Sequence, residues 1–336
     1  MSKKTYFLSL ALLFSANALA IKNGQPVDNK NYQSIIHSQY CSGTILGGKW
    51  VLTAEHCSTK EDTYPQIITS YDNKRTLVSQ QINYSDWSNN GSTIDAALWR
   101  LPQNIAINHI TIITPSPVQS GQDVTIFGYG GTANQLNKTT HRIINRSDFA
   151  PEYAVSLNNY NHGQTVGGDS GAPYLNNNNH LVAIHKGSQF QSNLQSDLAI
   201  ATKVSAFKDF ILETINGWNY PTNINNINGS QTITVQSLHN DVIQDQATTT
   251  GDVNIDFNKS TCSNNLISPY ETCTYVINGN GENGTLDLSP TEHIIINGQL
   301  DSHDKDKPII NNNKSGGGTL GIFILTLLTL VAFKRR

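Results

Sequence analysis

Ser170 lies between glycines in the segment GGDSGAP, residues 167–173. A serine hydroxyl is a weak nucleophile, and it becomes reactive only beside a base and in front of donors for a developing oxyanion. Gly168 and Gly171 allow a tight turn that directs backbone N–H groups outwards. We therefore predict that Ser170 is a nucleophile and that the amides of Gly168 and Ser170 form an oxyanion hole. The alternative is an ordinary turn of small residues.

A histidine and an aspartate elsewhere in the chain are candidate partners for this serine. His56 follows the apolar run of WVLTAEHC, and a disulfide from the adjacent Cys57 to Cys41 would hold the loop that carries the imidazole. Asp95 lies among apolar residues in IDAALWRL, where a carboxylate needs a hydrogen-bond partner. Taken singly, the histidine suits a structural or exposed position, and the aspartate suits a strand edge in water.

The four cysteines are predicted to form two disulfides. Their number is even, and the export signal described below places the chain in an oxidising compartment. We pair Cys41 with Cys57 and Cys262 with Cys273, so that each bridge closes a short loop. In the chain-entropy account, closing a loop of about 15 residues stabilises a fold by roughly 3 kcal/mol.

Residues 1–20 have the pattern of a secretory signal peptide. Two lysines precede a short apolar run, and small residues that suit signal peptidase end at Ala20. We expect cleavage there, export across the inner membrane, and a mature chain that begins at Ile21. A buried N-terminal helix is the alternative.

The C-terminus predicts a sorting tail. A polar linker at residues 301–318 ends in a glycine run, and residues 319–336 form an apolar segment with a basic end. A helix of about fifteen residues reaches only about 22 Å, against about 30 Å of hydrocarbon, and its basic end should stay cytoplasmic. The arrangement resembles the GlyGly-CTERM tails of Gram-negative bacteria. The resemblance implies a transient transmembrane anchor, removal by an intramembrane protease, and transfer to the cell surface or medium.

Short apolar strands separated by glycine and asparagine dominate residues 21–218, with SGTILGG, WVLTA, DVTIFGYGG and LVAIHKG the clearest. A helical period is confined to residues 204–215, where Ser205 suits the N-cap. The apolar face of this helix consists of Phe207, Phe210, Ile211 and Ile215. We predict an all-β domain, a barrel or a sandwich, with one closing helix.

Residues 219–300 alternate polar and apolar side chains at period two, as in QTITVQSL, DVNIDF and TCTYVING. Asn278-Gly279 and Asn283-Gly284 are predicted to be hairpin turns. We expect a small antiparallel β-sandwich, stapled by the second disulfide. It contains no cluster of catalytic residue types, so a spacer or docking module is the preferred interpretation.

Composition excludes several classes of protein. Charged residues make up 14% of the 336 residues and the formal net charge is −3, which argues against a nucleic-acid binder or a charged disordered chain. The length predicts about two domains. The histidines other than His56 and His185 have no metal-ligand spacing such as H-E-x-x-H, so we expect neither a metal nor another cofactor.

The segments TAEHC, IDAALWRL and GGDSGAP, in the order His, Asp, Ser, together resemble the chymotrypsin/trypsin-like serine protease family. The resemblance covers residues 21 to about 215 and implies two six-stranded antiparallel β-barrels with the site between them. It implies that Ser170 attacks a peptide carbonyl, that His56 moves the proton and that Asp95 orients the imidazole. The substrates would be proteins or peptides.

The predicted mature N-terminus, IKNG, resembles the tetrad with which mature members of that family begin. The resemblance implies that the α-amine of Ile21 pairs with Asp169 and thereby organises the oxyanion hole. Because nothing separates Ala20 from Ile21, signal peptidase would expose this amine directly, without a zymogen peptide.

The substrate pocket for P1, the residue before the cleaved bond, is not predicted to be trypsin-like. Gln164 stands where trypsin-like members have an aspartate that binds Lys or Arg. The segment VAIHKGS resembles bacterial glutamyl endopeptidases, which implies that His185 and Thr165 bind an acidic side chain, with Lys186 and Gly187 beside them. A neutral, small or apolar pocket is the alternative.

Three residues depart from the family pattern: Glu55 beside the histidine, Val166 in place of a cysteine, and Ala172 in place of a glycine. None of them removes a catalytic group, so we expect an active endopeptidase. The alternative from another class is a non-enzymatic surface adhesion or binding protein on a protease scaffold.

Overall fold

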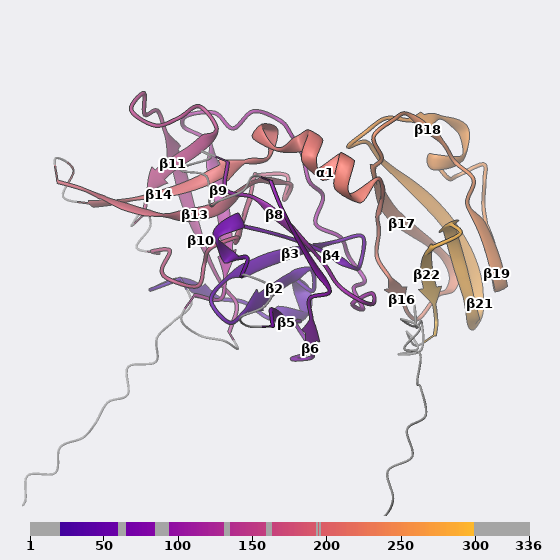
Figure 1. Ribbon diagram of the computed structural model, residues 1–336. Helices are drawn as coiled ribbons and strands as arrows, with labels where there is room; N and C mark the ends of the chain where they lie inside the picture. Colours follow the sequence, from indigo (N-terminus) through magenta and orange to yellow (C-terminus); the bar gives the residue numbers. More distant parts are fainter. Residues whose placement is uncertain are drawn as a thin grey trace, which may run out of the picture. The chain divides into compact units, whose positions relative to one another are not determined.

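The computed structural model describes residues 21–59, 65–84, 94–130, 135–158, 163–192, 194 and 196–298 (Figure 1). All of them belong to one compact unit that extends to Ser302. The predicted signal peptide, linker and sorting tail lie outside the described residues. Within the described residues, no helix combines the length and the apolar character that spanning a membrane requires.

The first β-region is a curled antiparallel sheet. Its strands are β2 (Ile35–Ser38), β3 (Ser42–Leu46), β4 (Trp50–Thr53), β5 (Ile67–Thr69), β6 (Arg75–Leu77), β7 (Gln80–Asn83) and β8 (Ala97–Arg100). They lie in the order β6-β5-β2-β3-β4-β8-β7. Thr53 at the end of β4 is opposite Ala97 at the start of β8. This pairing brings the residues that follow β4 close to those that precede β8, where His56 and Asp95 lie.

The second β-region is a closed antiparallel barrel of six strands. They are β9 (Asp123–Gly128), β10 (Asn137–Ile144), β11 (Tyr153–Leu157), β12 (Pro173–Leu175), β13 (Leu181–Gln191) and β14 (Ser196–Lys203), and β1 (Gln25–Pro26) extends the edge of β10. The barrel closes because β9 pairs with both β10 and β12. Ser170 lies just before β12. The two β-regions fit the predicted chymotrypsin-like architecture.

The helix after the barrel is shorter than the sequence predicts. Helix α1 (Lys208–Ile215) is preceded by a 3₁₀-turn, η4 (Val204–Ala206), which contains the predicted cap Ser205. The N-cap is instead Phe207, whose side chain makes no capping bond and is buried in the core. Burial of this aromatic ring therefore overrides the capping preference of the serine. Asn216, in the left-handed region with φ +38°, ends the helix.

Residues 217–298 form a further β-region (Figure 1). Its six-stranded sheet consists of β15 (Gly217–Asn219), β16 (Asn223–Ile224), β17 (Asn228–Leu238), β19 (Thr248–Ile255), β21 (Thr272–Ser289) and β22 (Glu292–Ile296), and β18 (Ile243–Gln244) pairs with β20 (Leu266–Ile267). All pairings are antiparallel except that of β16 with β22. The core contains Trp218 and Tyr275, and the Cys262–Cys273 disulfide lies within it.

The two predicted Asn-Gly hairpins are wrong, because both lie inside the long strand β21. Gly279 pairs with Gly229 in β17 and Gly284 pairs with Gly251 in β19, so neighbouring strands take up the backbone at both places. The residue with positive φ in this stretch is Gly281, at +94°. A hairpin turn at either Asn-Gly pair would reverse the chain, whereas the pairing with β17 and β19 keeps the backbone in the strand at both places.

Buried polar side chains join this further β-region to the connection between the first two. Gln236 in β17 is fully buried, accepts from the Ile113 amide at 3.0 Å, and donates to the carbonyls of Ile113 at 2.6 Å and Tyr270 at 3.0 Å. The buried Thr222 hydroxyl accepts from the amide of Ile107 at 2.9 Å. The contact therefore consists of hydrogen-bonded polar groups, and each group would lose its hydrogen-bond partner if the two parts separated.

Replacement of this glutamine should destabilise the protein. We expect Gln236→Ala to lower the free energy of unfolding by about 3 kcal/mol, because an unpaired buried amide or carbonyl costs about 1–3 kcal/mol. Urea unfolding followed by fluorescence measures the change. Gln231→Ala on the exposed part of the same strand is the matched control, and equal midpoints for the two variants would contradict the proposed contribution.

Candidate active site

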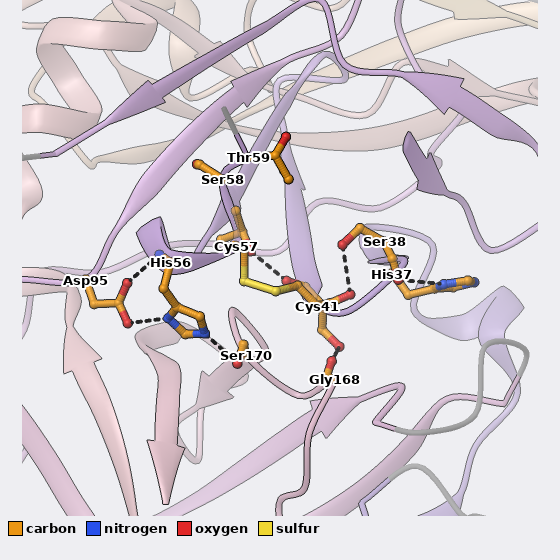
Figure 2. Close-up of a disulfide and its surroundings, with 12 residues drawn as sticks. His37, Ser38, Cys41, His56, Cys57, Ser58, Thr59, Asp95, Gly168 and Ser170 are labelled. Carbon is orange, nitrogen blue, oxygen red and sulfur yellow. Dashed lines mark hydrogen bonds and ion pairs between the residues drawn. A yellow bond between two sulfur atoms is a disulfide. The ribbon is translucent and has the colours of Figure 1, made fainter. Parts of the chain in front are cut away.

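Asp95 holds His56 through two hydrogen bonds. His56 lies in the 3₁₀-turn η2 (Glu55–Cys57), directly after β4, and Asp95 lies shortly before β8. The carboxylate is 2.7 Å from His56 Nδ1 through Oδ2, and Oδ1 accepts from the His56 backbone N–H at 3.0 Å (Figure 2). A carboxylate accepts at both contacts, so Nδ1 carries a proton and Nε2 is left to act as a base.

Ser170 meets the other nitrogen of the same ring. Its Oγ lies 2.8 Å from His56 Nε2, which places the three side chains in one hydrogen-bonded chain (Figure 2). The Asp95 side chain is 0% exposed and the His56 side chain is 31% exposed, so the chain runs from the interior to the surface. This geometry allows the serine hydroxyl to lose its proton to Nε2 while the oxygen attacks.

The Cys41–Cys57 disulfide lies beside the histidine and ties β3 to η2 (Figure 2). Both predicted pairs are present, the second being Cys262–Cys273. In the described part of the chain, Cys41, His56 and Cys57 are the one group of metal-ligating side chains with atoms close enough to share an ion. Both sulfurs are in the disulfide, so the group has no thiolate to offer a metal.

The turn before Ser170 presents two backbone donors. Gly168 has φ +100°, and a Cβ there would lie 2.2 Å from the carbonyl oxygen of Gly130, so only glycine fits. Ser42 holds the turn, since its N–H donates to the Ser170 carbonyl at 2.7 Å and its Oγ donates to the Gly168 carbonyl at 3.0 Å. Neither the Gly168 nor the Ser170 N–H donates to an acceptor in the described residues. Two such donors beside a nucleophile suit a developing oxyanion.

Asp169 lies between these two donors and is fully buried. Its carboxylate accepts from the amides of Gly130 and Val166, each at 2.8 Å. Burial raises the pKa of Asp169 to about 7, although the two amide bonds act in the opposite direction. Of the ion pairs between described residues, none includes Asp169. Asp169 is therefore a buried acid that has no positively charged partner among the residues that the structure describes.

Ile21 lies in the core, close to the segment of the chain that contains Asp169 and Ser170. Its side chain is buried in a cluster with Ala172 and Tyr174, which follow Ser170. The next residue, Lys22, accepts at its carbonyl from the Gln164 amide at 2.9 Å. Ile21 has φ +43°, a region that β-branched residues rarely adopt. The start of the predicted mature chain is thus docked against the loop that leads to the nucleophile.

The backbone of His185, in β13, forms hydrogen bonds with the two residues that follow Ser170 in the chain. Its N–H donates to the Ala172 carbonyl and its carbonyl accepts from the Gly171 amide, both at 2.8 Å. The imidazole is buried, and Nδ1 lies 3.0 Å from the Tyr174 hydroxyl. Burial, with a smaller contribution from the nearby His141, lowers the pKa of His185 to about 3. The ring is therefore neutral at ordinary pH.

The other predicted pocket residues have different surroundings. Thr165 is buried, whereas Gln164 is half-buried and bridged through its backbone to Lys22. The Lys186 ammonium donates to the Tyr153 hydroxyl at 2.7 Å and lies 4.7 Å from the centre of that ring. A Cβ on Gly187 would meet open space. Lys186 is thus engaged with an aromatic side chain of β11.

Sequence reasoning missed several residues of this site, among them Asn158, Ser188, Tyr174 and Ser42. No local signal marks them, because asparagine and serine are frequent throughout the chain and each acts through a partner distant in sequence. Glu55, which departs from the family pattern beside His56, is buried.

A cavity of about 410 Å³ opens beside Ser170, next to the Cys41–Cys57 disulfide. Its lining includes Tyr40, Tyr129 and Gly168. Ser170 and Gly168 therefore line a space that can receive a ligand.

A serine, a histidine and a carboxylate in this geometry, on two adjoining antiparallel β-regions, define the double-barrel class of serine hydrolases. Residues 21–211 match the family model named Trypsin, and the chain belongs to this family of serine proteases.

The chain is also similar to known proteins at low identity. Bovine chymotrypsin-like elastase family member 1 is 26% identical over 241 residues, which cover 58% of this chain and 89% of the relative. A trypsin from Simulium vittatum is 28% identical over 105 residues, 28% of this chain and 42% of the relative. Among solved structures, mouse neuropsin aligns with a TM-score of 0.49 and 18% identity over 57% of this chain and 99% of its own. The Vibrio cholerae VesB protease aligns with a TM-score of 0.46 and 19% identity over 82% and 98%.

The buried acid predicts a pH-dependent stability for a chain that retains Ala20, in which the nitrogen of Ile21 is an amide. The Asp169 carboxyl titrates at 3.8 in its ordinary state and at about 7 when folded, so the folded chain keeps a proton that the unfolded chain releases. Stability should be greatest below the lower value and fall as pH rises towards the higher one, by up to about 1.4 kcal/mol per pH unit.

Urea unfolding of the Ser170→Ala form of this chain, at several pH values across that window, measures the slope. Asp169→Asn should remove most of the slope, because the amide side chain does not titrate. Asp209→Asn is the matched control, since Asp209 is 75% exposed on α1. If Asp169→Asn and Asp209→Asn keep the same slope, burial of Asp169 is not its source.

Proposed function

We propose that this protein is an exported serine endopeptidase that hydrolyses peptide bonds through a Ser170–His56–Asp95 triad. The observation that carries the proposal is the unbroken hydrogen-bonded chain from the Asp95 carboxylate through the imidazole to the Ser170 hydroxyl. A protein that used the scaffold only for adhesion would have no need of this chain, or of two unengaged amides beside the serine.

The reaction follows from the positions of these groups. Ser170 Oγ attacks the scissile carbonyl carbon while His56 Nε2 takes its proton, and the negative oxygen accepts from the Gly168 and Ser170 amides. The protonated imidazole, held by Asp95, then gives the proton to the leaving amine. A water molecule, activated by the same histidine, hydrolyses the acyl-enzyme and frees Ser170.

Full activity requires, in this proposal, a free α-amine at Ile21. Signal peptidase would create it by cutting after Ala20, and the new ammonium would pair with Asp169, the buried acid without a cationic partner. The pair would keep the turn that bears Gly168 in shape. The support is the burial of Ile21 in the cluster that contains the residues after Ser170, and the bond between Lys22 and Gln164.

The P1 preference in this proposal is acidic rather than basic. Gln164 supplies no carboxylate for Lys or Arg, while the resemblance to glutamyl endopeptidases implies that the Thr165 hydroxyl and the His185 imidazole bind an acidic side chain. The Lys186 ammonium is engaged with Tyr153, so it supports the preference only through its charge. A pocket for a neutral, small or apolar P1 side chain is the competing possibility.

The chain's two ends support a location outside the cytoplasm. Residues 1–20 would direct export across the inner membrane of a Gram-negative bacterium, and residues 319–336 would anchor the protein until an intramembrane protease removes the tail. The product would be a cell-surface or secreted enzyme, with neither metal nor cofactor.

Labelling with a fluorophosphonate probe tests the enzymatic proposal. We expect the mature protein to label at Ser170, and Ser170→Ala to abolish labelling. Cleavage of a mixed peptide library should fall by about 10⁴-fold or more in both Ser170→Ala and His56→Ala. Ser116→Ala and His109→Ala, at exposed positions, are the matched controls. An intact protein that never labels would favour the adhesion alternative, and cleavage mainly after Lys or Arg would contradict the acidic pocket.

A second experiment tests the role of the new N-terminus. A mature chain extended by Ala20 should have a kcat/KM lower by roughly 10²- to 4 × 10³-fold, since a broken buried ion pair costs about 3–5 kcal/mol. In the correctly cut enzyme, the α-amine, whose pKa is ordinarily about 7.7–8.0, predicts a fall in activity as pH rises through its pKa in the ion pair. Edman sequencing of active enzyme should give Ile21, and equal activity of the extended chain would contradict the proposal.

A further inference from the structure

A second cavity, of about 640 Å³, lies within the further β-region and is larger than the one beside Ser170. Its walls come from β15, from β18 and the residues around it, and from the turn that joins β21 to β22. Among its described lining residues, none belongs to the triad, the oxyanion hole or the predicted P1 pocket. The cavity has the size of a small-molecule site, and the proposed protease function assigns it no role.

Trp218 supplies an unpaired donor in the wall of this cavity. The residue is 3% exposed, and its backbone N–H donates to the Glu292 carboxylate at 2.7 Å. Glu292 also accepts from the Ser289 hydroxyl at 2.8 Å, so the turn after β21 fixes the position of the tryptophan. The indole N–H, which can only donate, has no hydrogen-bond acceptor among the described residues. Because a buried tryptophan N–H normally has an acceptor, this donor points to an oxygen of a ligand.

The other polar groups of the lining both donate and accept. Gln244 and Gln246 carry side-chain amides and Thr248 carries a hydroxyl, and none of these three side chains has a hydrogen bond to a described residue. The Asp287 carboxylate accepts from His293 Nδ1 at 2.7 Å through Oδ1, while its Oδ2 has no donor among the described residues. One ligand can therefore give hydrogen bonds to this wall and receive them from it.

The lining has little charge and includes several apolar side chains. It contains no lysine or arginine among the described residues, and its carboxylate, Asp287, is bonded to His293. Burial lowers the pKa of His239, whose ring lies edge-on to Trp218 with 5.2 Å between centroids, so this imidazole is neutral at ordinary pH. Aliphatic carbon in the wall comes from Ile243, Leu288 and Pro290. An anion would meet a carboxylate without a lysine or arginine, and a wholly apolar ligand would leave the polar groups unpaired.

The strand that contributes Asp287 has no free edge at the cavity. In β21, Asp287 pairs with Thr248 of β19 on one side and with His293 of β22 on the other. An extended peptide is commonly bound when it adds a strand to a free edge. Because β21 has no such edge here, side chains must recognise the ligand at this wall.

We propose that this cavity binds an uncharged saccharide. Each sugar hydroxyl both donates and accepts a hydrogen bond, which matches the amides, the hydroxyl and the carboxylate of the lining, and the C–H groups of the sugar ring match its aliphatic carbon. A sugar oxygen would accept from the Trp218 indole N–H, and a sugar hydroxyl would donate to Asp287 Oδ2. This site goes beyond the proposed protease function, because it would bring the enzyme to surfaces or proteins that carry the saccharide.

Titration calorimetry with the Ser170→Ala protein tests the binding. The probes are uncharged trisaccharides of glucose, galactose, mannose and N-acetylglucosamine. Trigalacturonate is the charged match of the galactose probe, and the peptide Gly-Gln-Gly with blocked ends is an uncharged competitor of similar size. We expect at least one uncharged trisaccharide to bind with a Kd of about 1 mM or tighter, and both comparison ligands to bind at least about tenfold more weakly.

Two outcomes of this titration would overturn the proposal. One is that none of the uncharged trisaccharides binds at about 10 mM. The other is that trigalacturonate or the peptide binds more tightly than the best uncharged trisaccharide.

Substitutions in the wall locate the bound sugar. Trp218→Phe keeps an aromatic ring but removes the N–H, and Gln246→Ala removes an exposed amide. We expect each to weaken the binding of the sugar by about fivefold or more. The matched controls are Trp99→Phe, at another buried tryptophan, in β8, and Gln80→Ala, at an exposed position of β7, and both should keep the Kd within about twofold. Wild-type affinity in both the Trp218 and the Gln246 variants would overturn the assignment of this cavity.

The indole N–H signal of Trp218 gives a test that does not depend on the folding of Trp218→Phe. The chain contains four tryptophans, so NMR spectra of protein with isotope-labelled tryptophan, recorded with single substitutions of the other three, identify this signal. We expect the sugar to shift the Trp218 indole signal and to leave that of Trp99 in place. A Trp218 signal that does not move when the sugar is bound would contradict the predicted hydrogen bond.

Failure of this inference is distinguishable from failure of the proposed function. All binding measurements use Ser170→Ala, so they do not depend on catalysis. A protein that never reacts with fluorophosphonate but binds the sugar loses the protease function and keeps this site. A protein that labels at Ser170 but binds none of the uncharged trisaccharides overturns this inference alone.

Discussion

The hydrogen bonds that hold the His56 imidazole between Asp95 and Ser170 are the interactions on which the rest of the site depends. The position of the imidazole is set by a buried carboxylate that bonds both the ring and the backbone of the same residue. A buried carboxylate without such donors would cost several kcal/mol, so the hydrogen bonds that orient the base also make the burial of the acid possible. The pairing of β4 with β8 and the Cys41–Cys57 disulfide then keep the ring within reach of a serine that belongs to the other β-region.

The same physical device shapes the loop that carries the nucleophile. Asp169 accepts from two backbone amides, and Asn158 accepts from a third while donating to a carbonyl. Backbone groups cannot rotate away as side chains can, so buried acceptors that bind them fix the path of the chain. The buried side chains of Asp169 and Asn158 thereby hold the loop from Thr165 to Ser170. The amides of Gly168 and Ser170 in this loop donate to no described acceptor, so they can bind a ligand. Rigidity of this kind is what electrostatic stabilisation of an oxyanion requires.

The β-region at residues 217–298 is attached by the same principle. Gln236 and Thr222 satisfy backbone groups of the segment that connects the two β-regions with His56 and Ser170. Because those groups lie in the interior, the further β-region completes the hydrogen bonding of that connection. Without this contact, those backbone groups of the connection would lack their partners. The Cys262–Cys273 disulfide lies in the hydrophobic core of this further β-region.

The sequence by itself determined the side chains that meet, the two cysteine pairs and the all-β character, because short motifs, glycine geometry and strand periodicity are local properties. Only the tertiary structure decided the rest. The Asn-Gly pairs lie within β21 because flanking strands bind their backbone, and Ser205 does not cap α1 because Phe207 is drawn into the core. Lys186 contacts Tyr153, and Asn158 contacts Ser188, across strands that no local pattern relates. At these positions, the free energy of burial and of long-range hydrogen bonds is larger than the local conformational preference of the residue. The partners that supply this energy are distant in the sequence, so only the folded chain shows which of them meet.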